Sequence, residues 1–134
     1  MDTNDTKDFT GWIKLKENIH KIGRIRSFRE GEIWWAAMGE NVGIEINGKN
    51  DVFSRPVLVF RKFGPEGFLG IPLSSQIHNG IWYSNFSHNG IAECALLSQI
   101  RVLSVSRLYK RIGKVTKEDY EKIAAGLKKL YFRE

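Results

Sequence analysis

The stretch Ser54-Arg55-Pro56-Val57-Leu58-Val59-Phe60 decides the fold. A proline keeps the residue before it out of the helical region, so Arg55 is held in an extended backbone conformation. Unbroken apolar residues then follow, and a short run of this kind is typical of a strand that is buried inside a sheet. The sequence therefore predicts a core strand over residues 53–61 with a fixed arginine near its start.

Further strand signals lie on both sides of this stretch. Residues 32–38 form an apolar and aromatic run between glycines, which favours a strand. Strand signals continue at 67–73, around 81–83 and at 92–103, separated by the turn signals Gly64-Pro65, His78-Asn79-Gly80 and His88-Asn89-Gly90. Several short strands joined by tight turns predict a mainly β fold, a small barrel or half-open barrel.

Each end of the chain has the apolar spacing of a helix. Between residues 6 and 22, Phe9, Trp12, Ile13 and Ile19 recur at steps that form one apolar patch, and we expect this patch to pack on the barrel or across a dimer. Near the other end, Thr116 and a carboxylate three residues later resemble a capping box. The residues that share one face of this second helix are Tyr120, Ile123, Ala124, Leu127 and Leu130.

Length and composition bound the class of protein. With 134 residues, 42% of them hydrophobic, we expect a single domain over 1–134, with an N-terminal helical extension at 1–29 and a barrel with a C-terminal helix at 30–134. Cys94 is the only cysteine, which excludes an intramolecular disulfide and a cysteine-cluster zinc site. No apolar run approaches the ~20 residues of a membrane span. The first residues are acidic and unlike a signal peptide, so we expect a cytoplasmic protein that does not contact a membrane.

Positive charge is concentrated in the last part of the chain. The formal net charge is +6, yet residues 1–100 carry equal numbers of basic and acidic side chains, whereas residues 101–134 carry ten basic and four acidic ones. A second basic cluster without acids spans Lys21, Arg24, Arg26 and Arg29. Phosphate backbones attract such surfaces, so the charge favours a nucleic-acid partner, with a solvated basic face as the alternative.

Two motifs that would indicate other chemistry are incomplete. Residues 43–50 come close to a P-loop, but Asn50 stands where a P-loop needs Ser or Thr to hold magnesium, and a strand-like run follows in place of a helix. The three histidines His20, His78 and His88 lack metal-ligand spacing, so we expect no metal site.

Four segments, in this order along the chain, carry a family resemblance. Besides residues 54–60 they are Ile71-Pro72-Leu73-Ser74-Ser75-Gln76, Leu96-Leu97-Ser98-Gln99-Ile100-Arg101-Val102-Leu103 and Arg111-Ile112-Gly113-Lys114-Val115-Thr116. Together they resemble the MazF/PemK family of toxin endoribonucleases from type II toxin–antitoxin systems, over about residues 30–132. The first 29 residues are extra to compact members and resemble a longer PemK-like subgroup.

The resemblance implies both a fold and an activity. The implied fold is a small SH3-like barrel of the MazF/CcdB type, assembled as a homodimer and using no cofactor. The implied activity is metal-independent cleavage of single-stranded RNA at a short sequence, until a cognate antitoxin covers the groove.

The resemblance also assigns residues to the site. Arg55 matches the catalytic arginine before proline, and Ser74 matches the catalytic threonine, with its hydroxyl kept and its methyl lost. Glu45 lies where the family often has a loop glutamate, and Ser98 replaces an acidic residue that frequently precedes the Gln-Ile-Arg strand. The residues that we expect to bind the substrate are Glu45, Ser75, Gln76, Gln99 and Arg101.

The chemistry can also be argued from the residue types. In metal-free RNA cleavage the 2′-hydroxyl attacks the adjacent phosphorus, and negative charge gathers on the phosphoryl oxygens. A fixed guanidinium matches these oxygens with two parallel donors, and a serine hydroxyl adds a third. Arginine is a poor base, so the base stays open among Glu45, His78 and His88.

Two other functions stay open from the sequence. A CcdB-like toxin shares the barrel but acts by binding DNA gyrase, and a barrel without activity would serve as a binding module. In the pairs Trp34-Trp35 and Trp82-Tyr83 one ring faces each side of its strand, so an exposed ring would serve base stacking or an interface.

Overall fold

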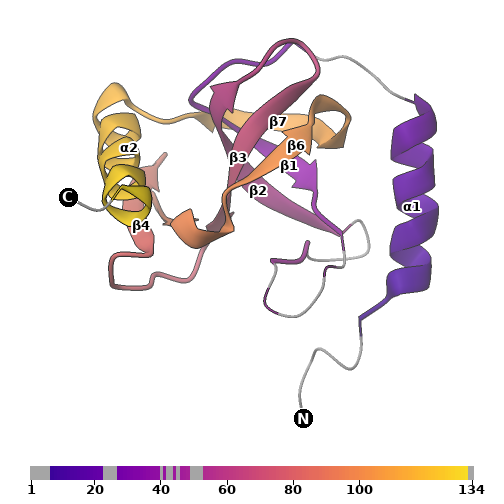
Figure 1. Cartoon of the computed structure of the whole chain (residues 1–134), viewed down its shortest axis with the longest axis horizontal. Helices are drawn as coiled ribbons and strands as arrows, with labels where there is room; N and C mark the ends of the chain where they lie inside the picture. The colour runs from indigo at the N-terminus through magenta and orange to yellow at the C-terminus, as the bar shows by residue number, and fades with distance from the viewer. Residues whose placement is uncertain are drawn as a thin grey trace.

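The computed structural model of the chain describes residues 7–22, 27–39, 41, 44, 46–48 and 53–132. Within these residues a helix lies at each end of a run of strands (Figure 1). The helices are α1 (Phe9–Ile22) and α2 (Lys117–Tyr131), with single 3₁₀ turns at η2 (Leu97–Gln99) and η3 (Val105–Arg107). The strands are β1 (Glu32–Ala37), β2 (Ser54–Lys62), β3 (Gly67–Ser74), β4 (Tyr83–His88), β5 (Ile91–Leu96), β6 (Arg101–Ser104) and β7 (Leu108–Lys114).

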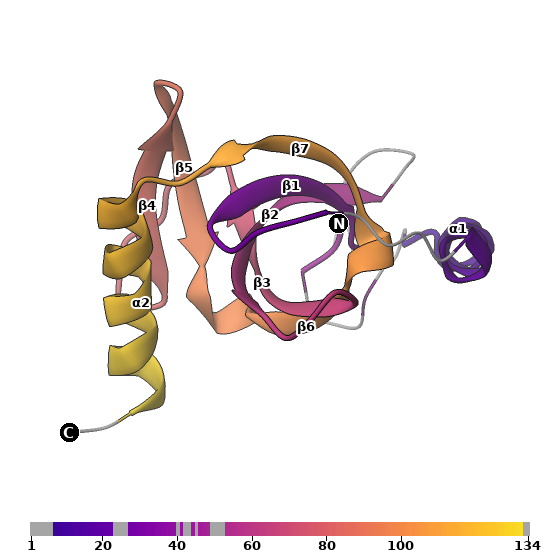
Figure 2. The ribbon, with the colours of Figure 1, turned by 90° about the horizontal axis from the view of Figure 1, so that it is seen from above.

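The strands pair antiparallel in the order β4-β5-β3-β2-β1-β7, and β6 pairs with β3 off this path. β3 changes partner along its length, because Gly67 to Gly70 pair with β6, whereas Leu73 and Ser74 pair with β5. Seen from above, β1, β2, β3, β6 and β7 curl into a ring, and the β4–β5 hairpin stands beside α2 (Figure 2). The predicted fold class, a mainly β half-barrel with a helix at each end, is confirmed.

β2 is buried on both faces, as its unbroken apolar run predicts. Alternate residues point to opposite sides of a strand. Val57 and Val59 belong to one apolar cluster, together with Trp34 of β1 and Phe68 of β3. Leu58 between them belongs to a second cluster, which the buried residues of α2 complete. The same strand therefore anchors both halves of the core.

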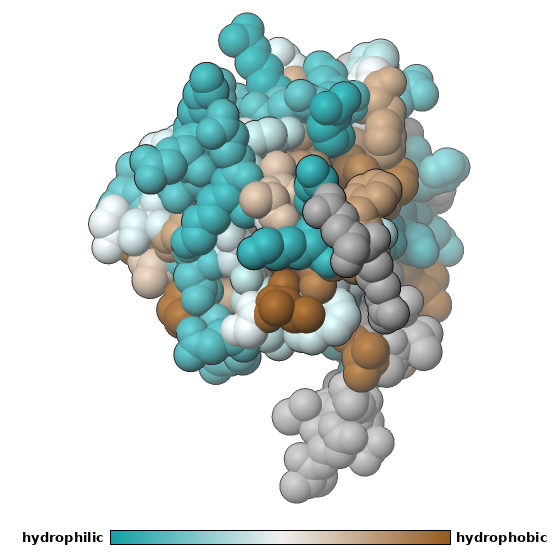
Figure 3. Space-filling model, turned by 60° about the vertical axis from the view of Figure 1, so that its left-hand side comes forward, coloured by the Kyte–Doolittle hydropathy of each residue, from teal (hydrophilic) through white to brown (hydrophobic). Residues whose placement is uncertain are grey.

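Both helices bury apolar residues against the strands. In α2, Thr116 Oγ1 accepts a hydrogen bond from the Asp119 N–H at 3.1 Å, and Ile123 and Leu127 are buried. In α1, Trp12 is buried against the barrel, whereas Phe9 and Ile13 are 45% and 53% exposed on the single chain, so their packing across a dimer stays a prediction. Figure 3 shows that hydrophilic side chains cover much of the α2 side of the molecule.

The predicted strand at 92–103 is wrong as a single element. The chain turns at η2, where the Leu97 N–H donates to the carbonyl of Trp82 at 3.0 Å. The first half pairs with β4 and the end of β3, whereas the second half pairs with the beginning of β3. Because β3 curls, one straight strand cannot follow it along both parts.

Two further boundaries differ from the sequence signals. The signal around 81–83 marks only the start of β4, which is polar and buries alternate residues such as Ser84 and Phe86. Asn89 and Gly90, with φ of 51° and 77°, form the expected turn from β4 into β5.

β7 has no apolar run because it is mostly exposed. Neither described helix is long and apolar enough to cross a membrane.

A buried carboxylate ties β1 to β7. Glu32 accepts hydrogen bonds from Arg111 Nε at 2.7 Å, from Trp34 Nε1 at 3.1 Å and from the Arg29 N–H at 2.7 Å. Burial alone raises the pKa of this carboxyl, but the hydrogen bonds and the charge of Arg111 outweigh burial and lower the pKa below its ordinary value of 4.5. The charged form of Glu32 therefore stabilises the fold.

We expect Glu32→Gln to lower the free energy of unfolding at pH 7 by about 2 kcal/mol, because a buried charged hydrogen-bond network is broken. The folded-state pKa lies below the unfolded-state value. The stabilisation is therefore present above about pH 4.5 and is lost as the pH falls through the folded-state pKa. Denaturant unfolding of both proteins at pH 7, 5 and 3 should show the difference shrinking toward pH 3. Glu30→Gln, which breaks an exposed pair with Arg61, is the control. A difference that is constant with pH would contradict the assignment.

Candidate active site

Arg55 and Ser74 lie beside each other on neighbouring strands. Val57 of β2 opposes Pro72 of β3, and the same antiparallel register, continued by two residues, places Arg55 opposite Ser74. Opposed residues share a face of the sheet, so both side chains project to the same side. On the other side of β3, Ser74 opposes Cys94, which is buried. The strand register thus brings the two predicted catalytic residues together.

The Arg55 guanidinium is fixed by backbone carbonyls. Its Nε donates to the carbonyl of Asn47 at 2.9 Å, and its Nη1 donates to the carbonyl of Leu73 at 3.1 Å. The residue is 7% exposed, and burial lowers the pKa of the guanidinium below its ordinary value. No described carboxylate forms an ion pair with it. Arg55 is therefore an oriented cation whose charge the described part of the protein does not neutralise.

The Ser74 hydroxyl is able to donate a hydrogen bond to a substrate. The residue is 9% exposed, and its Oγ accepts a hydrogen bond from the Gln76 N–H at 3.1 Å. Because this bond uses a lone pair of the oxygen, the hydroxyl can still donate. Ser75 and Gln76 are exposed in the turn after β3. These two predicted substrate-binding residues therefore lie on the surface next to Ser74.

Gln99 connects the end of η2 to the chain between β1 and β2. Its Oε1 accepts a hydrogen bond from the Ile46 N–H at 3.1 Å, and its Nε2 donates to the carbonyl of Ile44 at 3.2 Å. Both ends of the amide are thus used by the backbone of this connection. The expectation that Gln99 binds the substrate stays a prediction, and the structure adds a role in holding the connection in place.

A groove of about 420 Å³ lies between this connection and η2. Arg101, another predicted substrate-binding residue, lines it together with Asn41, Ile44, Ile46, Ser98, Gln99 and Ile100. Arg107 lies close enough for the charge of Arg101 to add to burial in lowering the Arg107 pKa. Positive charge therefore extends beyond Arg55 to this end of the barrel.

Of the three candidate bases, one faces away from Ser74, and Glu45 lies outside the described residues. His88 is three residues from Asn85, which opposes Cys94, so it faces the side of the sheet opposite to Ser74 and packs against Gly113. Glu93, whose pKa burial raises, also faces that opposite side, because it is next to Cys94.

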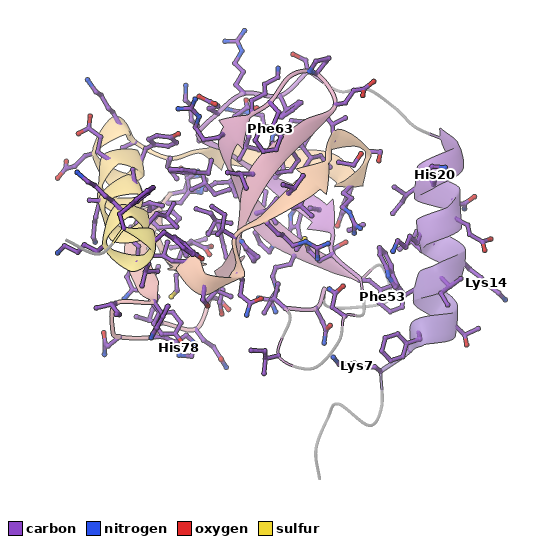
Figure 4. All side chains as sticks on the ribbon, in the orientation of Figure 1. Lys7, Lys14, His20, Phe53, Phe63 and His78 are labelled. Atoms are coloured by element: carbon purple, nitrogen blue, oxygen red, sulfur yellow. The ribbon has the colours of Figure 1, made fainter. Side chains whose placement is uncertain are left out.

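His78 remains on the side of the site. Its ring stacks on Tyr83 with centroids 4.9 Å apart, and its carbonyl accepts a hydrogen bond from Asn85 Nδ2 at 2.8 Å. Asn85 shares its face of the sheet with Cys94 and Ser74. Figure 4 shows His78 at the lower left of the molecule, whereas Phe53 and Lys7 lie at the right, next to α1. Trp82, the residue before Tyr83, is 51% exposed, so its indole is accessible for stacking on a base or for an interface.

Sequence reasoning missed Asn41 and Asn47. Asn41 donates from Nδ2 to the carbonyls of Met38 at 3.1 Å and Ile46 at 2.7 Å, and its N–H donates to Asn47 Oδ1 at 2.6 Å. Asn47 in turn accepts from Arg55. The one available signal is the pair Asn47-Gly48, which is typical of a turn. The described residues hold no group of three or more His, Cys, Asp or Glu side chains placed to bind a metal ion.

Comparisons with known proteins place the chain in a family. The family model described as "PemK-like, MazF-like toxin of type II toxin-antitoxin system" matches residues 29–131, which is most of the chain. No curated protein matches the sequence.

Solved structures share the fold at low sequence identity. MazF from Deinococcus radiodurans superposes with a TM-score of 0.65 at 18% identity, covering 78% of this chain and 96% of that one. The MazE–MazF complex from the same organism gives 0.62 at 18% identity, covering 81% and 100%. An endoribonuclease from a mycobacterial species, in complex with its cognate antitoxin, gives 0.61 at 12% identity, covering 81% and 98%. At these identities the likeness shows a common fold.

We expect Gln99→Leu to free the connection between β1 and β2 locally. Two hydrogen bonds of about 1 kcal/mol each are lost, so the Ile46 amide should exchange about 10-fold faster with solvent or more. Hydrogen exchange followed by NMR measures this, with the exposed neighbour Ser98→Ala as the control. Unchanged exchange at Ile46 would show that Gln99 does not hold this backbone.

Proposed function

Because the chain belongs to the PemK-like, MazF-like toxin family of type II toxin–antitoxin systems, we propose that it cleaves single-stranded RNA at a short sequence in the cytoplasm, without a metal ion. The observation that carries this proposal is the Arg55 guanidinium. It is buried, held by two backbone carbonyls, unpaired with any described carboxylate and placed opposite a serine hydroxyl. Such a cation suits a phosphoryl group better than any uncharged substrate.

The proposed reaction is an internal transfer. The 2′-hydroxyl oxygen attacks the adjacent phosphorus and gives its proton to a base, while the bond to the 5′-oxygen breaks and that oxygen takes up a proton. The products are a cyclic 2′,3′-phosphate and a 5′-hydroxyl. Arg55 donates to the phosphoryl oxygens as charge builds on them, and the Ser74 hydroxyl adds a further hydrogen bond. His78 and Glu45 are the two candidates for the base.

The direct test is cleavage of a long RNA by the purified chain in EDTA. We expect fragments with 5′-hydroxyl and cyclic phosphate ends, and sequencing of these ends gives the recognised sequence. No cleavage of any sequence would refute the proposal. Gyrase-dependent DNA breaks in place of RNA cleavage would favour the CcdB-like alternative.

We expect Arg55→Ala to slow cleavage by about 10²-fold or more, because the transition state loses its main cation. Arg55→Lys should recover little, since an ammonium lacks the two parallel donors. Ser74→Ala should cost less than Arg55→Ala, and Ser74→Thr should stay active because the hydroxyl survives. Single-turnover rates measure these effects, with Arg61→Ala on the exposed end of β2 as the control. Cleavage by Arg55→Ala at the parental rate would show that the site lies elsewhere.

The proposed partners are RNA, a cognate antitoxin and a second copy of the chain. Two of the similar structures are complexes with an antitoxin, and the cations around Arg55 and Arg101 suit an acidic peptide that excludes RNA. We propose that an antitoxin of this kind binds here and that the toxin is a homodimer. Sedimentation at several concentrations tests the dimer.

We expect inhibition by the product of a neighbouring short reading frame to weaken with salt. Exposed charges are screened within about 10 Å at 0.1 M salt, so both the association rate and part of the affinity should fall between 50 mM and 500 mM salt. Inhibition constants measured over this range check the prediction. Inhibition that is independent of salt would indicate an apolar contact surface in place of the cationic one.

A further inference from the structure

α1 lies outside the residues matched by the family model, yet Trp12 in its first turn is docked against the barrel. Trp12 is 5% exposed, and its ring lies 5.8 Å from that of Phe53, measured between centroids. The indole occupies the space beside Gly39, where a Cβ would come within 2.1 Å of it. The Arg107 guanidinium lies 5.6 Å from the indole centroid and donates to the carbonyl of Ala37 at 2.9 Å.

Trp12 therefore touches both ends of the connection between β1 and β2. Gly39 lies at the first end and Phe53 at the second, and the N–H groups of Met38 and Gly39 both donate to the Phe53 carbonyl, at 2.8 and 3.0 Å. Phe53 has a φ of 53°, which is a strained value for a bulky aromatic residue. Such a conformation persists only where its surroundings hold it, and Trp12 is one of those surroundings.

A short series of contacts leads from these ends to Arg55. The Gly48 N–H donates to the Gly39 carbonyl at 2.8 Å, and the backbone of Gly48 leaves no room for a Cβ against the Phe53 carbonyl. The preceding residue, Asn47, accepts a hydrogen bond at its carbonyl from Arg55 Nε at 2.9 Å. The Asn47 carbonyl and the Gly48 N–H belong to one peptide unit, so the group that orients the guanidinium is tied by a hydrogen bond to Gly39, on which Trp12 packs.

The residue at the start of the described chain adds a second tether. Lys7 Nζ donates to the carbonyl of Asn41, and Figure 4 shows Lys7 below α1, at the end of the molecule where Phe53 lies. Asn41 holds the carbonyl of Ile46 and the side chain of Asn47. Lys7 is therefore linked through Asn41 to Asn47, the residue whose carbonyl contacts Arg55.

We propose that Trp12 is a positioning residue for Arg55, and that α1 serves as a strap that holds the Asn47 carbonyl in place. This inference rests on the proposed RNA cleavage. Displacement of a catalytic group by about 1 Å can cost about 10²-fold in rate, so a contact distant from the substrate can control catalysis in this way.

The first test is a double-mutant cycle in the full chain, with kcat and KM measured over a range of RNA concentrations. Trp12→Ala should lower kcat by about 10- to 100-fold with little change in KM, because Arg55 acts on the transition state. Trp12→Phe, which keeps a ring, should recover most of the rate. The exposed Ile13→Ala on the same helix should leave the rate unchanged.

The decisive comparison is made in the Arg55→Ala background. If Trp12 acts through Arg55, Trp12→Ala should add no further loss there, since its target is gone. A loss that multiplies with that of Arg55→Ala would overturn the inference and leave Trp12 with a role in stability only.

The second test does not depend on activity. In Trp12→Ala, hydrogen exchange at Gly48 should rise by about 10-fold or more, while the core strand amide of Leu58 keeps its protection. Unchanged exchange at Gly48 would overturn the inference even for an active enzyme. Absence of RNA cleavage by the parental chain, with the exchange result as expected, would refute the proposed function and leave the strap intact.

Discussion

The carbonyls of Asn47 and Leu73 hold a buried cation, and the site depends on this interaction. A guanidinium that is largely removed from water loses hydration, and only groups that remain pointed at it can replace that loss. The Leu73 carbonyl belongs to β3, and the Asn47 carbonyl belongs to the connection between β1 and β2. The position of Arg55 is therefore set jointly by a rigid strand and by a segment that needs its own support. Because the connection between β1 and β2 needs this support, contacts from outside the sheet converge on its backbone at residues 46–48.

The sheet supplies the rigid half because β2 is buried on both faces. Residues with alternate orientation, such as Val57 and Leu58, enter separate apolar clusters, so a shift of register by one residue would exchange both sets at once. The pairing of β2 with β3 is therefore strongly fixed, and Arg55 stays opposite Ser74. Arg101 and Arg107 extend the positive charge from there, and neither forms an ion pair with a described carboxylate. A polyanion bound at this end would supply the charge that the described residues lack.

The sequence was sufficient for the parts of the molecule that local patterns control. The apolar run of β2, the Asn89-Gly90 turn and the Thr116 cap each act over a few residues, and each was predicted. The break at η2 and the edge strand β7 depend on which strand lies alongside, so no local pattern marks them. The family motifs indicated that Arg55 and Ser74 share one site. They did not indicate that the Asn47 carbonyl accepts a hydrogen bond from Arg55, because every residue has a carbonyl and no side chain marks this one.

The docking of α1 also depends on a contact that local sequence patterns do not mark. The apolar spacing of α1 predicts a packed helix, but this spacing does not say which of its rings is buried. Trp12 is the ring that lies against a glycine, Gly39. Gly39 has a φ of 81° and no side chain, which together create the flat surface that an indole can cover. An alanine at this position would be both strained and in contact with the ring. The docking of α1 and the backbone conformation of the connection between β1 and β2 therefore depend on each other through the contact of Trp12 with Gly39 and Phe53.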